Sequence, residues 1–347
     1  MKAGGMLGLL VLSAALFAGR ASADEVKITG AGATFPYPIY QTWAHRYEKL
    51  TEVKINYQGI GSGGGIKLIT QGTVDFGGTD APLTDKEIDE AGFVQFPMVV
   101  GGVVPVANLK GVEAGKLKLT PDVLADILLG HIKNWNHERI KQANPDLALP
   151  DQAITVVARS DPSGTTWIYT DYLAKVSKEW KEKVGRSKKP EWPVGQLAKG
   201  NPGVAALVQQ IEGAIGYVEY AYALQEKMAT TLLKNKAGKF ASPDLKSFQA
   251  AAAHADWKAS PAYYVILTDQ PGDETWPIAG ATFVLVHKKQ KDAAKAKAML
   301  TFFDWAYRHG QDAAKELHYV PMPMKVIEMV EETWSKQITA DGEPVWP

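Results

Sequence analysis

The sequence predicts an α/β fold divided into two lobes, and three observations carry this prediction. Apolar runs rich in β-branched residues alternate along the chain with stretches of helical periodicity, as in α/β proteins. Two of the apolar runs, residues 96–107 and 276–287, are long and extended, which suits strands that cross between lobes. The segment between them, about residues 108–275, has the length of a separate domain.

The amino-terminal part is expected to begin with a strand that enters a glycine-rich turn. In the helix expected next, Ile39, Trp43 and Tyr47 recur every four residues and so share one face. The strands expected in this part are residues 26–29, 53–57 and 74–77, and the helices are residues 36–50 and 66–70.

The middle and the end of the chain continue the alternation. Between the two crossing strands we expect helices at residues 121–129 and 167–174, a strand at residues 154–158, and a tight turn into a strand at residues 213–223. The last two helices, residues 293–307 and 326–337, are expected to pack back on the first lobe.

The first residues have the composition of a secretory signal peptide. Lys2 precedes an apolar run at residues 6–17 that is too short to span a bilayer, and Ala21-Ser22-Ala23 forms an A-x-A cleavage site. A buried amino-terminal helix is the alternative, but it leaves the A-x-A boundary unexplained. We therefore expect cleavage after Ala23 and export of the mature protein. The chain has no cysteine, so its apolar core must stabilise it without disulfides.

The charge balance argues against a nucleic-acid partner. The full chain has 38 basic and 38 acidic residues, and loss of residues 1–23 removes Lys2 and Arg20, which leaves 36 against 38 and a formal charge of −2. Proteins that grip nucleic acid are usually basic or carry a basic stripe. The nearest such cluster, residues 181–189, includes glutamate and is expected to be a solvated loop.

Three short stretches rich in glycine and hydroxyl residues lie where helices are expected to begin, at residues 30–35, 59–65 and 159–166. A helix start has unpaired backbone N–H groups and a partial positive charge, so each stretch is a potential oxyanion site. Arg159 belongs to the third stretch, and Asp80 follows the second. Together they predict a site that encloses a small tetrahedral anion.

Two other interpretations of the second stretch remain open from the residues alone. Residues 59–64 match the G-x-G-x-x-G dinucleotide pattern, and Asp80 follows about twenty residues later. The helix expected after this turn is short, however, and a dinucleotide site leaves residues 159–166 unexplained. The glycines would otherwise simply form a tight strand-to-helix turn.

An enzymatic site has no clear nucleophile in this sequence. Neither Ser62 nor Ser163 lies in a G-x-S-x-G motif, and no lysine follows a glycine loop as in a Walker A motif. The histidines include no H-E-x-x-H pair, so no metal site is expected. The enzyme class stays an alternative without a catalytic residue.

Seven stretches of the chain, in order, resemble one family. They are TGAGATFP (29–36), YQGIGSGGG (57–65), VDFGGTDAP (74–82), IKNW (132–135), RSDPSGT (159–165), GAIGYVEY (213–220) and FFDWA (302–306). The resemblance is to the periplasmic phosphate-binding proteins of bacterial phosphate-specific ABC transporters (the PstS family), and it covers essentially the whole mature chain. That family often has serine or glycine where Gly63 and Pro162 stand, so one hydroxyl and one backbone N–H are missing near the implied site.

The resemblance implies a type II, two-lobed venus-flytrap fold with the two crossing strands as its hinge. Lobe I would hold residues 24–107 and 276–347, and lobe II residues 108–275. The cleft would bind inorganic phosphate with high affinity in the periplasm, and the protein would deliver it to an ABC-type importer without catalysis, cofactor or metal. The implied partners are phosphate and the permease and ATPase subunits, with the receptor a monomer. A receptor for another oxyanion (sulfate, molybdate or arsenate) and an exported phosphate-ester hydrolase are the alternatives.

The resemblance also implies the ligand residues, carried over position by position. Main-chain N–H groups and the Thr34 hydroxyl would bind from the first turn, and Asp161 would pair with Arg159 and hold its guanidinium in place. The implied phosphate-binding residues are Ala33, Thr34, Phe35, Ser62, Asp80, Arg159, Asp161, Ser163, Gly164 and Thr165.

Overall fold

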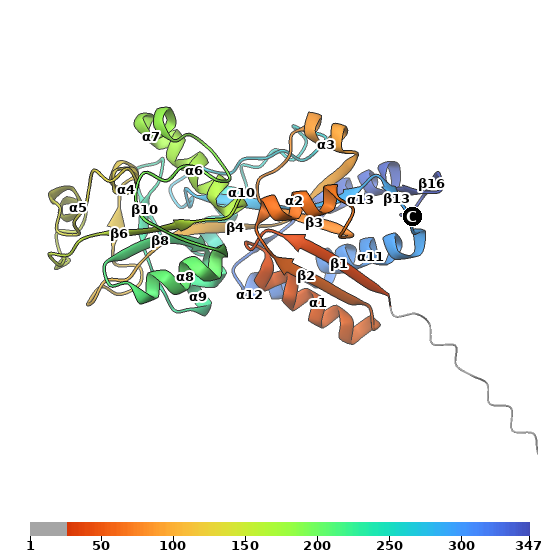
Figure 1. Ribbon diagram of the computed structural model, residues 1–347, viewed down its shortest axis with the longest axis horizontal. Helices are drawn as coiled ribbons and strands as arrows, with labels where there is room; N and C mark the ends of the chain where they lie inside the picture. The colour runs from red at the N-terminus through yellow and green to blue at the C-terminus, as the bar shows by residue number, and fades with distance from the viewer. Residues whose placement is uncertain (1–25) are drawn as a thin grey trace, which may run out of the picture.

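The computed structural model describes residues 26–347, so the signal peptide expected at residues 1–23 lies outside the described part. Two halves lie along the long axis, one built from both ends of the chain and the other from its middle (Figure 1). No helix in this described part combines the length and apolar character that a membrane crossing requires. The mixed α/β architecture expected from the sequence is confirmed.

One ten-stranded sheet runs through both halves, and two three-stranded sheets accompany it. The strands are β1 (Lys27–Gly32), β2 (Lys54–Gly59), β3 (Phe76–Thr79), β4 (Phe93–Ala107), β5 (Lys118–Leu119), β6 (Thr155–Arg159), β7 (Gln196–Ala198), β8 (Ala214–Glu219), β9 (Ala229–Thr230), β10 (Leu232–Lys234), β11 (Phe240–Ala241), β12 (Ala279–His287), β13 (Lys289–Gln290), β14 (Val320–Pro321), β15 (Thr339–Ala340) and β16 (Glu343–Pro344). The large sheet has the order β2-β1-β3-β12-β4-β8-β6-β7, with β14 and β9 also paired to β4.

The strand β4 belongs to both halves. Its residues 93–102 pair antiparallel with β12, and its residues 103–107 pair antiparallel with β8. All 15 of its residues are buried, which explains why this strand is an unbroken apolar run in the sequence. The first expected crossing strand is therefore present. The second is a strand only from Ala279 onward, opposite Gly102.

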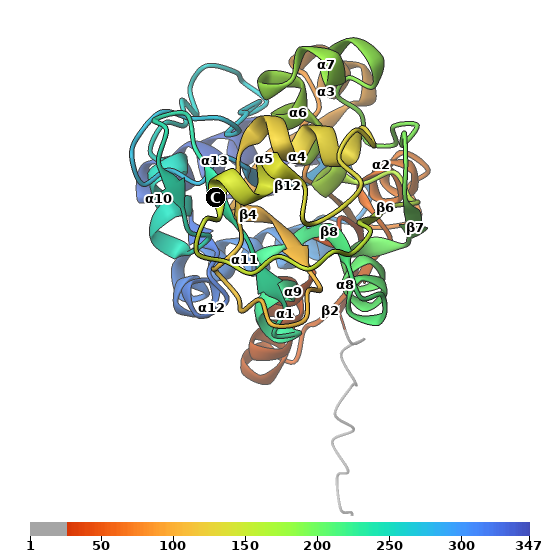
Figure 2. The same cartoon turned by 90° about the vertical axis from the view of Figure 1, so that its left-hand side faces the viewer.

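Helices cover the large sheet. They are α1 (Tyr37–Thr51), α2 (Ser62–Thr70), α3 (Asp85–Ala91), α4 (Pro121–Leu128), α5 (Glu138–Ala143), α6 (Gly164–Val176), α7 (Lys178–Lys183), α8 (Gly200–Gln210), α9 (Tyr220–Gln225), α10 (Leu245–Ala252), α11 (Ala293–His309), α12 (Gln311–Glu316) and α13 (Met324–Gln337). Figure 2 shows the middle-of-chain half from its outer end, with α4 and α5 toward the viewer.

The carboxyl-terminal helices pack on the amino-terminal half, as expected. The Tyr47 ring of α1 meets the Phe302 ring of α11 edge-on, with centroids 5.3 Å apart. The Trp43 indole N–H donates to the Gly310 carbonyl between α11 and α12 (2.9 Å). Both ends of the chain therefore share one core.

Two segments differ from expectation because side chains cap new helices. Part of residues 181–189, expected as a loop, is helix α7, since Ser177 caps it and the Trp180 side chain is fully buried. Residues 213–223, expected as a turn into a strand, form the strand β8 and then turn into α9. The side chain of Glu219 caps that helix.

The helix α2 also begins earlier than expected, at Ser62 instead of residue 66, because Gly61 takes up a positive φ of 89° and ends the extended segment. This helix lies very close to β1. A Cβ on Gly65 would stand 2.5 Å from the Gly32 Cα and 2.6 Å from the Ala31 carbonyl oxygen. Only glycine at position 65 allows that approach.

Replacing Gly65 with alanine is expected to lower the free energy of unfolding by about 1–3 kcal/mol, because the new methyl meets backbone that cannot move aside. Gly203 of α8 is the matched control, since a Cβ there has no neighbour nearer than 3.6 Å. Alanine at position 203 should instead stabilise the protein by up to about 1 kcal/mol. Urea unfolding measures both, and equal effects would contradict the close approach of α2 to β1.

Candidate functional site

The second and third glycine-rich turns touch each other directly. The N–H of Gly164, at the start of α6, donates to the Ser62 hydroxyl at the start of α2 (3.0 Å). The Gly63 N–H donates to the Pro162 carbonyl (3.0 Å). Two helix starts from opposite halves of the molecule thus face one another, with their partial positive charges in one place.

The first turn, between β1 and α1, is held by three buried tyrosines. Each of three consecutive carbonyls accepts a hydrogen bond from a tyrosine hydroxyl of a different element. The pairs are Tyr57 with Ala33 at 2.9 Å, Tyr222 with Thr34 at 2.7 Å, and Tyr319 with Phe35 at 2.7 Å. The first two bonds fix the peptide planes that carry the N–H groups of Thr34 and Phe35, and the third fixes the Phe35–Pro36 peptide, which has no N–H, at the end of the turn.

One N–H group of this turn has a hydrogen-bond acceptor in the protein, and two have none. The Ala33 N–H donates to the Gly78 carbonyl (2.9 Å). The N–H groups of Thr34 and Phe35 have no acceptor within residues 26–347, although both residues are buried. Buried N–H groups are almost always paired, so these two N–H groups remain available to donate to a ligand.

The hydroxyl groups around the turns are also constrained to donate. The Ser62 oxygen accepts two N–H groups, from Gly164 (3.0 Å) and Asp80 (3.2 Å). The Thr34 oxygen accepts twice from Asn201, from the backbone N–H (3.2 Å) and the side-chain amide (2.8 Å). A hydroxyl oxygen has two lone pairs, so each of these groups has only its hydrogen left to offer. Such a site suits an oxyanion, because most of its oxygens carry no hydrogen and can only accept hydrogen bonds.

Asn201 is a site residue that the sequence analysis missed. It is fully buried, its amide also donates to the Thr165 hydroxyl oxygen (3.2 Å), and its own oxygen accepts from the Glu219 N–H (2.9 Å). Residues 200–203, Gly-Asn-Pro-Gly, form a fourth glycine-rich helix start. That resemblance to the other three turns is the sequence signal that could have found it.

Arg159 supplies a positive charge, and part of its guanidinium is paired with a carboxylate. Its Nε and Nη2 donate to the two oxygens of Asp161 (2.9 and 2.6 Å), and the Gly200 N–H donates to Asp161 Oδ1 (3.0 Å). Burial by itself raises the pKa of Asp161, but the hydrogen bonds and charge of Arg159 and the Gly200 N–H hold that pKa below its usual value. Arg159 Nη1 is buried and has no partner in the described residues. One arm of the guanidinium therefore remains for a ligand.

Asp80 is the acceptor in this set of donors. Its Oδ1 accepts from the Thr282 hydroxyl of β12 (2.8 Å), and its Oδ2 is buried with no partner among residues 26–347. Burial raises the pKa of Asp80 to about 7, against the hydrogen bond from Thr282 and the charge of Arg159, which lower it. When Asp80 is ionised, its unpartnered Oδ2 can accept a hydrogen from a ligand that carries one.

The two departures from the family pattern lie in contact. A Cβ on Gly63 would stand 2.5 Å from the Pro162 Cβ, so glycine at position 63 makes room for proline at position 162. A Cβ on Gly61 would likewise stand 2.4 Å from Asp161 Oδ2. The start of α2 at residues 61–63 is thus packed against residues 161–162, where a dinucleotide site would need an open turn.

All ten residues implied by the resemblance take part in this connected set of contacts, but some of their groups are used internally. The N–H groups of Ala33 and Gly164 already have protein acceptors. The Ser163 hydroxyl oxygen caps α6 by accepting from the Thr166 N–H (3.0 Å). These three residues shape the site, and the Ser163 hydrogen stays available.

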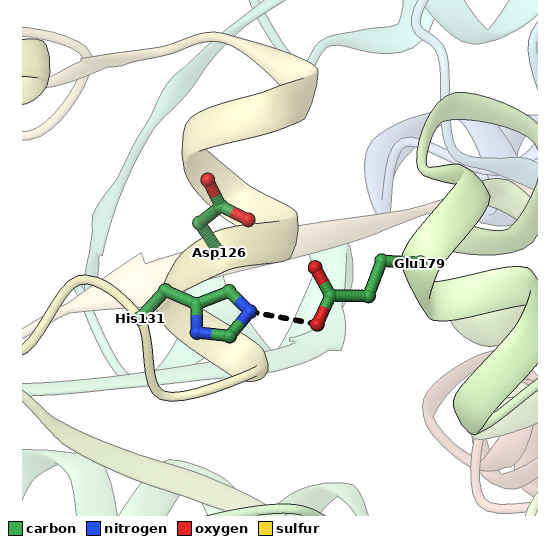
Figure 3. A group of neighbouring side chains, drawn as sticks. All are labelled: Asp126, His131 and Glu179. Carbon is green, nitrogen blue, oxygen red and sulfur yellow. Dashed lines mark hydrogen bonds and ion pairs between the residues drawn. The ribbon is translucent and has the colours of Figure 1, made fainter.

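A second group of polar side chains lies on α4, α7 and the turn after α4. Ligand atoms of Asp126, His131 and Glu179 lie within 4.8 Å of one another (Figure 3). His131 Nε2 hydrogen bonds to Glu179 (2.8 Å), Lys183 also pairs with Glu179 (2.7 Å), and Arg139 pairs with Asp126. Because each carboxylate already has a cationic partner, we assign this group to the packing of α7 beside α4.

Comparisons with known proteins identify the family and the fold. A model of the PBP superfamily domain matches residues 18–309. The phosphate-binding protein PstS of Pasteurella multocida is 51% identical over 320 residues, 92% of this chain and 93% of that protein. The PstS of Haemophilus influenzae is 50% identical over 316 residues, 91% and 95% of the two chains. A solved phosphate-binding protein from Stenotrophomonas maltophilia has a TM-score of 0.68 at 20% identity, covers 92% of this chain and 97% of its own, and so shows the shared fold.

Arg159→Ala is expected to lower the free energy of unfolding of the ligand-free protein by about 3 kcal/mol, because it leaves the Asp161 carboxylate without its partner. Adding Asp161→Asn removes that charge and keeps an oxygen for the Gly200 N–H, so the double variant should regain part of the loss. Urea unfolding of both single variants and the double variant measures the coupling. If the two single effects simply add, Arg159 and Asp161 do not act as a pair.

Proposed function

This chain belongs to the PstS phosphate-binding proteins of the PBP superfamily, and from that premise we propose that it binds inorganic phosphate with high affinity and delivers it to an ABC-type phosphate importer. The names of the relatives supply the ligand class. The site supplies the physical reason why this chain would take phosphate and not another oxyanion.

The observation that carries the proposal is one buried site with many hydrogen donors and one unpaired acceptor. The donors are the N–H groups of Thr34 and Phe35, the hydroxyls of Thr34 and Ser62, and Nη1 of Arg159. The acceptor is Oδ2 of Asp80. Phosphate near neutral pH carries at least one hydrogen for that oxygen, whereas sulfate carries none and would meet a carboxylate with nothing to share.

We assign the implied residues to three roles in this shell. Asp80 accepts from the ligand, and Asp161 orients the arginine. The donors to phosphate are Thr34, Phe35, Ser62, Arg159, Ser163 and Thr165, while Ala33 and Gly164 shape the backbone around it. Hydrogen bonds to a charged ligand contribute about 1.5–3 kcal/mol each, so four of them reach the roughly 8 kcal/mol of micromolar binding.

The geometry favours a receptor over the hydrolase alternative. A hydrolytic serine needs a neighbouring base to remove its proton. The Ser62 oxygen receives two N–H groups and the Ser163 oxygen receives one, and neither hydroxyl hydrogen bonds to a histidine or carboxylate side chain in the described residues. These hydroxyls serve as donors to a bound anion.

We propose that the two halves are lobes that close on phosphate, with residues 24–107 and 276–347 in lobe I and residues 108–275 in lobe II. The continuous strand β4 then crosses between them. The shell divides accordingly, with Thr34 to Asp80 on one lobe and Arg159 to Thr165 on the other. Contacts such as Gly164 to Ser62 form only when the lobes meet.

We further propose that residues 1–23 are a signal peptide cleaved after Ala23, so that the mature protein works in the periplasm. There it would act as a monomer without catalytic activity. Its membrane partners would be the permease and ATPase subunits of the importer. The sequence features of residues 1–23 and the similarity to PstS proteins support this assignment.

Phosphate is expected to compact the protein, because only the closed arrangement satisfies donors from both lobes. Small-angle X-ray scattering with and without phosphate measures the radius of gyration. Sulfate at the same concentration is the control and should leave the radius unchanged. An identical radius in all three conditions would show that closure does not depend on the ligand.

Calorimetry should detect tight phosphate binding that needs no metal, and weak or absent sulfate binding. An activity assay should detect no phosphate release from an aryl phosphate.

Asp80→Asn should keep much of the phosphate affinity, because an amide oxygen still accepts the ligand hydrogen. Sulfate should compete against labelled phosphate better in that variant than in the parent, since the repelling charge is gone. Unchanged competition would place the selectivity elsewhere in the shell.

A further inference from the structure

Glu219 is a buried carboxyl at the junction of the two halves, where β8 ends and α9 begins. It is fully buried and pairs with Val103 of β4. Its Oε2 lies 2.7 Å from the Tyr319 hydroxyl and accepts the Ala221 N–H at 3.0 Å. This side chain has no place in the ligand shell described above, yet it contacts a tyrosine that holds the first turn.

The Tyr319 hydroxyl has more acceptors than hydrogens. It lies 2.7 Å from the Phe35 carbonyl oxygen and 2.7 Å from Glu219 Oε2. A carbonyl has no hydrogen to give, so the second of these short contacts needs a hydrogen that only Glu219 can supply. Both contacts are satisfied when Glu219 donates to Tyr319 and Tyr319 donates to Phe35. Oε2 then still accepts from the Ala221 N–H.

The surroundings of Glu219 favour the neutral acid. Its Oε1 is buried without a hydrogen-bond partner within residues 26–347. Burial raises the pKa of Glu219 well above its usual range, and the charge of Asp80 adds to the rise.

We propose that Glu219 is a neutral carboxylic acid and a positioning residue. It donates its hydrogen to the Tyr319 hydroxyl, and Tyr319 in turn donates to the Phe35 carbonyl. The pair thereby holds the turn whose N–H groups face the anion. The backbone of Glu219 supports the same turn by a second route. Its N–H donates to Asn201, which in turn donates to the Thr34 hydroxyl oxygen. The effect on phosphate rests on the proposed function, whereas the protonation of Glu219 does not.

Infrared difference spectroscopy tests the protonation without phosphate. The parent minus Glu219→Gln spectrum at neutral pH should contain the C=O stretch of a neutral carboxylic acid. Both proteins carry Asp80→Asn as well, because the pKa of Asp80 is about 7 and its own carboxyl bands could otherwise change between the two spectra. A difference spectrum with carboxylate bands only would overturn the proposal. If Glu219→Gln does not fold, the NMR chemical shift of the Glu219 carboxyl carbon in the parent decides the same point.

Calorimetry with inorganic phosphate tests the positioning role. Tyr319→Phe removes the hydrogen bond to Phe35 and should weaken binding about twofold to tenfold. Glu219→Gln should weaken it similarly, because an amide cannot at one position both accept from the Ala221 N–H and donate to Tyr319. An acceptor-only Glu219 would instead be replaced without loss, since the amide oxygen accepts both hydrogens.

Tyr172→Phe is the matched control, because the Tyr172 hydroxyl is buried without a partner in the described part of the chain. It should bind phosphate as the parent does. Parent-like affinity in both Tyr319→Phe and Glu219→Gln would overturn the positioning role. A parent protein that binds no phosphate would instead refute the proposed function, and the infrared result would still decide whether Glu219 is neutral.

Discussion

The site depends on the way that three tyrosine hydroxyls hold three consecutive carbonyls, those of residues 33–35. Tyr57 approaches from β2, Tyr222 from α9 and Tyr319 from the segment before β14. Fixing the first two carbonyls also fixes the N–H groups of the residues that follow them, because a peptide is planar, while the third carbonyl belongs to the peptide before Pro36, which has no N–H. The turn can therefore present two N–H groups to an anion without a charged side chain of its own.

The other residues around the site also offer hydrogen-bond donors with little net charge. The hydroxyls of Ser62 and Thr34 are turned into donors because N–H groups occupy their lone pairs. Arg159 is largely neutralised by Asp161, and Asp80 is buried without a formal counter-ion of its own. In the proposed function, recognition would depend on the count and direction of hydrogens, which differ between phosphate and sulfate although the two ions have the same shape.

The long strand β4 places this shell between the halves. Its Gly101 lies under the first turn, where a Cβ would come within 2.8 Å of the Phe35 ring. Just beyond it, β4 leaves β12 and begins to pair with β8, whose last residue is Glu219. The point at which the sheet passes from one half to the other is therefore also the point that supports the first glycine-rich turn.

Much of this protein was predictable from the sequence alone. The apolar runs and the helical periodicity around Trp43 predict the α/β class and the crossing strand, because each depends on neighbours along the chain. The anion site indicated by the three glycine-rich turns stays a prediction. Helix limits were less predictable, as α7 and the early start of α2 show, since a cap or a single positive φ decides them. The tertiary structure alone decided which distant groups meet. Tyr319 and Phe35 are separated by 284 residues, and Asn201 reaches the first turn across 167. No local pattern encodes such partners, because a hydrogen bond between remote residues exists only after packing has placed its donor and acceptor within reach.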